Sequence, residues 1–265
     1  MKNVLLLVHN DPGQEARFQA ALDLTRALAG HLYCLDVTPF MLVYDSGWGF
    51  GPSVVVDESD QEAANKARMR QRLSHEDVSW SWLDAVGDYA DCLLAAGKTA
   101  DVIVLNRKFG KASRPDMLAT ASKVLTQSEA LVVAVDETCQ AFAVAGPALI
   151  AWDGSDKALH ALQRAVPLLA LAGEVEIFQA GPLPEGAIPA EEAAAYLSRH
   201  GIKAIIDMVP ESDDPAAEIC AAAKRLGASY CVMGAYGHNR LEEALLGGVS
   251  RRMLSAANIP LVLAH

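Results

Sequence analysis

Short apolar runs alternate with amphipathic stretches along the whole chain. The runs at residues 4–8, 130–135, 147–152 and 230–233 have the length of buried strands. A polar turn follows the first run, and apolar residues then recur at helical spacing over residues 13–29. Strict alternation of strands and helices is typical of a parallel sheet that is covered by helices on both faces. The pattern therefore predicts an α/β fold.

The same series of predicted elements occurs twice. Residues 2–8 and residues 147–152 each open a succession of alternating strands and helices, and the boundary between the copies falls near residues 136–146. The two copies are of similar length. We therefore predict two tandem doubly wound domains, each with a five-stranded parallel sheet, over residues 1–140 and 147–265.

Composition narrows the class of protein. The chain has 265 residues, 52% of them hydrophobic, and a net charge of -11, which argues against a nucleic-acid binder because such surfaces are normally basic. The first apolar run is only of strand length, so neither a signal peptide nor a membrane span is predicted. Five cysteines without Cys-x-x-Cys spacing predict reduced thiols in a cytoplasmic protein and no structural metal site.

A glycine-rich stretch near the end of the chain carries the best candidate chemistry. The predicted strand 230–233 runs into Gly234 and Gly237, and Gly247 and Gly248 precede a stretch with helical spacing. Glycines let a backbone approach a ligand closely, and the free N–H groups of a helix start attract anions. The Walker and dinucleotide-binding spacings are both absent. Two interpretations stay open: a phosphate cradle, or glycines that only shape a tight loop.

This spacing resembles that of the universal stress protein family, whose nucleotide-binding members carry Gly-x2-Gly-x9-Gly-Ser/Thr. Gly234, Gly237 and Gly247 match the pattern in order, whereas Gly248 stands where a hydroxyl residue is expected. The resemblance to the tandem form of the family covers essentially the whole chain. It implies binding of ATP or a related adenine nucleotide, with Mg²⁺ as a further candidate. It also implies a compact pseudo-two-fold pair of halves or a homodimer.

The resemblance extends the site to other strand ends. It places Asp153 against the nucleotide sugar, whereas helix capping is the alternative role for this residue. It places Ala180 and Met233 beside the base, whereas ordinary core packing is the alternative. Ser250 is a candidate to compensate in part for the missing hydroxyl. The predicted nucleotide-binding residues are Ala151, Asp153, Ala180, Met233, Gly234, Gly237, Gly247, Gly248, Val249 and Ser250.

The first copy departs from this pattern. Asn106 stands where the first glycine belongs, and residues 118–122 contain no glycine before the last helix. Asp11 is out of register with its expected partner because the turn after the first strand is longer. No nucleotide site is therefore predicted in this half. A basic stretch in this half is a candidate for an anion contact, or else a solvated loop: Arg107, Lys108, Lys111 and Arg114. A glycine-rich stretch at residues 46–52 is a candidate for a lid or a partner-contact loop.

No catalytic constellation is present in the sequence, since Gly-x-Ser-x-Gly and His-Glu-x-x-His are both absent. We therefore expect a nucleotide-binding protein that acts in a stress response through ligand-dependent association. Its enzymatic activity, if any, would be at most a slow hydrolysis of ATP. A scaffold that has lost nucleotide binding, or a binder of another small anionic metabolite, is the alternative. Gly248 and the acidic pair Glu242 and Glu243 favour that alternative.

Overall fold

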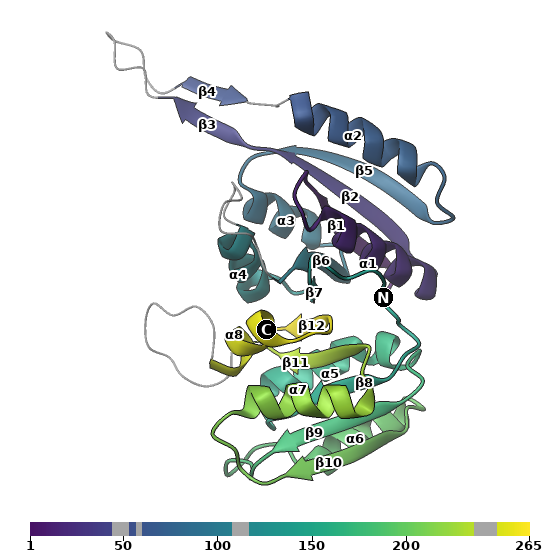
Figure 1. Cartoon of the computed structure of the whole chain (residues 1–265), viewed down its shortest axis with the longest axis vertical. Helices are drawn as coiled ribbons and strands as arrows, with labels where there is room; N and C mark the ends of the chain where they lie inside the picture. The colour runs from purple at the N-terminus through teal and green to yellow at the C-terminus, as the bar shows by residue number, and fades with distance from the viewer. Residues whose placement is uncertain (44–52, 57–59, 108–116, 236–247) are drawn as a thin grey trace.

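The computed structural model describes residues 1–43, 53–56, 60–107, 117–235 and 248–265 of the chain (Figure 1). Strands and helices alternate through these ranges, which confirms the predicted α/β fold. The first half contains β1 (Asn3–Val8), β2 (His31–Thr38), β3 (Phe40–Val43), β4 (Ser53–Val56), β5 (Ser79–Val86), β6 (Val102–Asn106) and β7 (Leu131–Val135), with α1 (Gln14–Ala27), α2 (Asp60–Leu73), α3 (Tyr89–Gly97) and α4 (Met117–Gln127).

The second half repeats this succession without the short β3–β4 ribbon. It contains β8 (Ala148–Ala151), β9 (Val175–Ala180), β10 (Ala204–Val209), β11 (Tyr230–Gly234) and β12 (Leu261–Ala264), with α5 (Asp156–Leu169), α6 (Ala190–Arg199), α7 (Pro215–Leu226) and α8 (Gly248–Ala256). Side-chain caps mark several helix starts, because a polar side chain satisfies an N–H group that has no partner within the helix. Ser155 caps α5 in this way and Asp214 caps α7.

All ten main strands form one sheet, in the order β10-β9-β8-β11-β12-β7-β6-β1-β2-β5. Inside each half every pairing of this sheet is parallel, and the two halves have the same internal order when read from their outer ends. The halves meet where β7 pairs with β12, the only antiparallel contact in this sheet as described. We predicted a five-stranded parallel sheet in each copy; each half does contribute five parallel strands, and the structure joins the two sets edge to edge in one sheet. The division at residues 140 and 147 stays a prediction.

The joint between the halves has approximate two-fold symmetry. Asn106 pairs with Val135 in the first half as Gly234 pairs with Ala264 in the second. Val133 and Val262 therefore occupy equivalent places, and they face each other across the joint. Two identical edge strands can pair about a two-fold axis only if they run antiparallel, which explains the change of direction at this single pairing.

Each face of the sheet carries one hydrophobic core that runs through both halves. Helices α1, α2, α5 and α6 cover one face, where Phe18 and Leu162 are fully buried. Helices α3, α4, α7 and α8 cover the other, where Leu93 and Met253 are fully buried. Burying a large apolar side chain contributes roughly 1.5–3 kcal/mol, so the continuous cores hold the halves together as well as stabilising each.

Arg107 adds a polar tie across the joint. Its side chain is almost completely buried at the end of β6, donates to the carboxylate of Asp136 at 2.8 Å, and reaches the carbonyl of Leu254 in α8 at 3.4 Å. A cation beside the last carbonyls of a helix is favourable because these carbonyls have no partner within the helix. Burial lowers the pKa of Arg107.

We expect Arg107→Met to weaken this tie between the halves. The substitution removes both contacts of the guanidinium and leaves Asp136 without this cation, so the free energy of unfolding should fall by about 1.5–3 kcal/mol. Urea unfolding of the whole chain measures the change. Arg199→Met, at the exposed end of α6, is the matched control and should shift stability by less than about 0.5 kcal/mol. Equal effects of the two substitutions would contradict the proposed role of Arg107.

Candidate functional site

The candidate site lies at the carboxyl ends of the central strands of the second half. Ligands of open α/β sheets bind at this edge, where the strand order changes direction. Here the change falls at β8, which has β9 on one side and β11 on the other. Ala151 and Met233 are paired neighbours at the ends of β8 and β11, and both are buried in the same core. Ala180, at the end of β9, is partly exposed and packs against that core.

Gly234 ends β11 in a crowded position. A Cβ atom at Gly234 would lie 2.8 Å from the backbone of both Lys157 and Ala158, in the first turn of α5. The absence of a side chain therefore lets this helix pack directly on the end of the strand. The structure thus gives Gly234 a packing role, on a side of the strand that faces α5.

Helix α8 begins at Gly248, and its first turn supplies the candidate anion-binding N–H groups. A Cβ at Gly248 would meet no atom of the described residues within 4 Å, so none of them crowds the helix start. Val249 is half-buried against the core, and Ser250 is buried. Gly237 and Gly247 lie outside the described residues, as do Lys108, Lys111, Arg114, Glu242, Glu243 and residues 46–52.

Asp153 follows β8 and shapes the turn into α5. Its Oδ1 atom accepts hydrogen bonds from the N–H of Ser155 at 3.0 Å and from the Ser155 hydroxyl at 2.6 Å. The Ser155 hydroxyl oxygen in turn accepts from the N–H of Ala158, which caps the helix. Ser155 and not Asp153 is therefore the N-cap of α5, and Asp153 supports the turn that leads into the helix. The Asp153 side chain nevertheless remains exposed at the strand edge.

Lys157 is a basic residue at this edge that the sequence analysis missed. It lies in the first turn of α5 beside Gly234, and its Nζ atom is 3.1 Å from Nε2 of His265. The main-chain oxygen of His265 is 2.9 Å from Nδ1 of His160. Burial lowers the pKa of Lys157, and burial together with Lys157 and His160 lowers the pKa of His265. Placing the predicted helix start against the strand ends would have indicated Lys157.

The first half has an aspartate in the same kind of turn. Oδ1 of Asp11 accepts from the N–H of Gly13 at 2.7 Å, two residues on, as Oδ1 of Asp153 accepts from Ser155. Gly13 and Ser155 are both the residue that precedes the following helix. Asp11 and Asp153 therefore make the same kind of turn into the following helix. Counted along the paired strands, however, His9 and not Asp11 is the residue equivalent to Asp153, so Asp11 is out of register, as predicted. The longer turn places its extra residues before the aspartate.

Arg17 fills the space beside Asp11. Its side chain is completely buried, and its guanidinium donates to both carboxylate oxygens of Asp11, at 2.9 and 2.8 Å. It also donates to Oδ1 of Asn106, the residue equivalent to Gly234. The Asn106 amide donates in turn to the carbonyl of Gly13 at 3.2 Å. Side chains of the first half therefore occupy the strand edge that glycine leaves clear in the second.

A wider polar network closes this edge of the first half. Nδ1 of His9 lies 3.1 Å from Glu62 and 3.3 Å from the Tyr89 hydroxyl, whose pKa is raised by burial. Gln14 of α1 and Asn65 of α2 exchange two amide hydrogen bonds, at 2.8 and 2.7 Å. Buried polar groups are costly unless paired, so these residues act as a mutually satisfied set.

Two classes of feature receive no support among the described residues. No described group of three or more His, Cys, Asp or Glu side chains is arranged to hold a metal ion. No helix within the described ranges has the length and apolar character that crossing a membrane requires. The site thus consists of strand ends, a helix start, one exposed carboxylate and one lysine.

Comparisons with known proteins agree with this architecture. The model of the universal stress protein family matches residues 146–265. A universal stress protein from Archaeoglobus fulgidus DSM 4304 covers 99% of this chain and 97% of its own at 15% identity, with a TM-score of 0.71. A protein of unknown function from Pseudomonas aeruginosa PAO1 covers 100% of this chain and 92% of its own at 18% identity, with a TM-score of 0.63. The comparison with curated protein sequences found no match.

The strand order and the comparisons together define the class of protein. The chain is a tandem α/β protein in which two copies of one strand order share a sheet. Residues 146–265 match the model of the universal stress protein family, and the chain as a whole has the fold of a solved universal stress protein. At these sequence identities the solved structures establish the fold alone.

We expect the two described glycines of the motif to respond differently to a methyl group. Gly234→Ala brings Cβ into the backbone of α5, so the free energy of unfolding should fall by about 1–3 kcal/mol. Gly248→Ala meets open space at a helix start and should leave stability unchanged or slightly raised. Thermal unfolding without ligand compares the two variants. A stable Gly234→Ala protein would contradict the packing role.

Proposed function

We propose that the second half binds ATP or a related adenine nucleotide at the carboxyl ends of β8 and β11. The observation that carries this proposal is the contrast between the two halves. In the first, Arg17 holds Asp11 and Asn106 fills the strand edge, whereas in the second Asp153 is exposed and Gly234 carries no side chain. Side chains occupy the strand edge in only one of the two copies, and this difference supports ligand binding at the other copy.

The described residues fit the parts of such a ligand. Ala180 and Met233 offer apolar surface and backbone groups for the base, and Ala151 lies next to Met233. The carboxylate of Asp153 suits ribose hydroxyl groups, or a Mg²⁺ ion that arrives with the phosphates. The first turn of α8, from Gly248 through Val249 to Ser250, would receive phosphate oxygens because its N–H groups and helix dipole favour negative charge. Gly237 and Gly247 remain proposed contacts on their spacing.

In this proposal the protein acts by association and not by catalysis. Bound nucleotide changes the surface of the second half, and that surface recruits a partner in a stress response. No general base is assigned at this edge. Lys157, beside Gly234, adds positive charge near the phosphates.

A scaffold without nucleotide is the second candidate. It is supported by two observations: Gly234 is explained by packing against α5, and Asp153 is explained by the turn into that helix. Gly248 also lacks the hydroxyl that would donate to a phosphate. Another small anionic metabolite at the α8 start is a variant of this candidate.

Calorimetric titration of the chain with ATP and Mg²⁺ distinguishes the candidates. We expect one site per chain, because Arg17 and Asn106 occupy the equivalent edge of the first half. Sedimentation velocity with and without ATP then measures ligand-dependent association. Two equivalent sites would contradict the blocked first half, and the absence of any heat of binding would favour the scaffold.

Gly248→Ser tests the helix start directly. The new hydroxyl lies in open space and adds a donor to a charged acceptor, so ATP affinity should rise about fivefold, or about 1 kcal/mol. Gly248→Ala is the matched control, since it adds the same Cβ atom without the hydroxyl. Identical affinities in the two variants would show that no phosphate lies within reach of residue 248.

A further inference from the structure

Strand β10 is the outermost strand of the second half, and nothing in the described part of the chain pairs with its free edge (Figure 1). It carries two of the exposed large apolar side chains of the described residues, Ile205 at 51% exposure and Met208 at 55%. Edge strands are templates for pairing with another chain, and natural proteins normally protect them with charge, proline or a covering element. Exposed apolar residues at such an edge indicate a contact surface.

The backbone of β10 is arranged to accept a further strand. The carbonyl of Val209 accepts from the N–H of Gly181, just beyond β9, at 2.9 Å. Backbone groups alternate in direction along a strand, so Asp207 and Ile205 also turn theirs toward β9. The N–H and carbonyl groups of Ala204 and Ile206 therefore point to the free edge.

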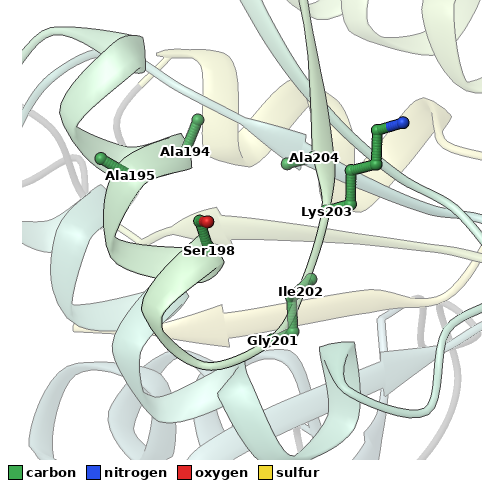
Figure 2. Close-up of a pocket in the computed structure, with 7 residues that line it drawn as sticks. All are labelled: Ala194, Ala195, Ser198, Gly201, Ile202, Lys203 and Ala204. Carbon is green, nitrogen blue, oxygen red and sulfur yellow. The ribbon is translucent and has the colours of Figure 1, made fainter.

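The side chains of β10 divide between the two faces of the sheet. Ala204 and Ile206 pack against the core beneath α6, so Met208 lies on that face. Asp207 pairs with Arg225 of α7, so Ile205 and Lys203 lie on the opposite face. Figure 2 shows the Lys203 side chain directed away from α6.

We propose that β10 pairs antiparallel with β10 of a second copy of this chain, about a two-fold axis at Ile205. In this register Ala204 of each copy exchanges backbone hydrogen bonds with Ile206 of the other copy. Ile205 faces itself, and Lys203 faces Asp207 of the second copy. These are the positions without backbone hydrogen bonds, where opposed Cα atoms approach to about 4.5 Å and side chains interact most closely.

Charge favours this register. On the α7 side of the edge, Arg225 is the cation shared by Asp207 and Glu176, with Glu176 at 3.5 Å. Two carboxylates share this one cation, so negative charge is in excess there; burial, and after it the neighbouring Asp207, raise the pKa of Glu176. Because of the two-fold axis, Lys203 of each copy would face Asp207 of the other copy. The excess would therefore be offset at both ends of the paired strands. An axis at Ile206 would instead oppose Asp207 to Ile205 and leave Lys203 facing Val209.

The α6 side of the edge offers a matching cavity. A pocket of about 430 Å³ lies between α6 and the start of β10, lined by small residues such as Ala194, Ser198 and Ala204 and by Ile202 (Figure 2). In the proposed register Met208 of the second copy stands opposite Ile202, on this same face. The methionine would therefore enter the pocket. Strand register places Trp80 of β5 at the position equivalent to Ala204, so the first half has a large side chain where the second half leaves this space.

The chain already uses the same device internally. Strands β7 and β12 pair antiparallel about equivalent valines and thereby join the two halves. The proposed contact would repeat that arrangement between chains, at the outer end of the sheet. It is independent of the nucleotide site, which faces the ends of the central strands.

Sedimentation equilibrium of the full chain without nucleotide tests the proposal. The wild-type protein should form a concentration-dependent dimer. Ile205→Lys places like charges opposite each other at the axis and should raise the dissociation constant at least about tenfold. Val86→Lys, on the exposed edge strand β5 at the other end of the sheet, is the matched control and should leave the dimer unchanged. A monomeric wild type, or equal effects of the two substitutions, would overturn the proposal.

Disulfide cross-linking tests the register. Ile205→Cys would bring two thiols together at the axis, where opposed Cβ atoms lie about 4.5–5.5 Å apart, so oxidation should yield a covalent dimer on a non-reducing gel. Met208→Cys would hold its two thiols about 20 Å apart and should stay uncross-linked. The wild-type chain, with its five native cysteines, gives the background. Cross-linking through residue 208 and not residue 205 would overturn the proposed axis.

Discussion

The antiparallel pairing of β7 with β12 is the constraint on which the rest of the structure depends. It brings Val133 opposite Val262 and so sets an approximate two-fold relation between the halves. It pairs the edge of β7 with the edge of β12, which leaves β5 and β10 as the only outer strands of this sheet among the described residues. It also makes each core continuous across the joint, so neither half can open its sheet edge without exposing apolar surface on both faces.

The two halves show how a repeated fold can keep one site and fill the other. Asp11 and Asp153 make the same turn, yet Asp11 meets the buried guanidinium of Arg17 whereas Asp153 is exposed. A buried cation needs several acceptors to offset its lost hydration, and Arg17 finds them in Asp11, Asn106 and nearby carbonyls. These hydrogen bonds satisfy the buried charge only when all of the partners are present. The set therefore acts as a fixed part of the first half and occupies the place that a ligand would take.

The glycines of the second half combine two physical reasons for lacking a side chain. Gly234 is needed because α5 packs on the end of β11, whereas no described residue lies within 4 Å of the place a Cβ of Gly248 would take at the start of α8. One spacing pattern can therefore contain both a packing requirement and a binding surface. The pattern alone does not distinguish them, because both leave the same residue in the sequence.

The sequence by itself determined the α/β class, the repeat, the strand ends near which Asp153 and Gly234 lie, and the helix start at Gly248. It could do so because periodic burial and helix starts leave a local pattern. It also showed that Asn106 breaks the glycine pattern in the first half. Only the tertiary structure decided that β7 meets β12, that Arg17 is buried against Asp11, and that Lys157 lies beside Gly234. Contacts between residues far apart in sequence leave no local pattern, and a charged residue on an amphipathic helix looks like a surface residue until the strands that bury it are in place.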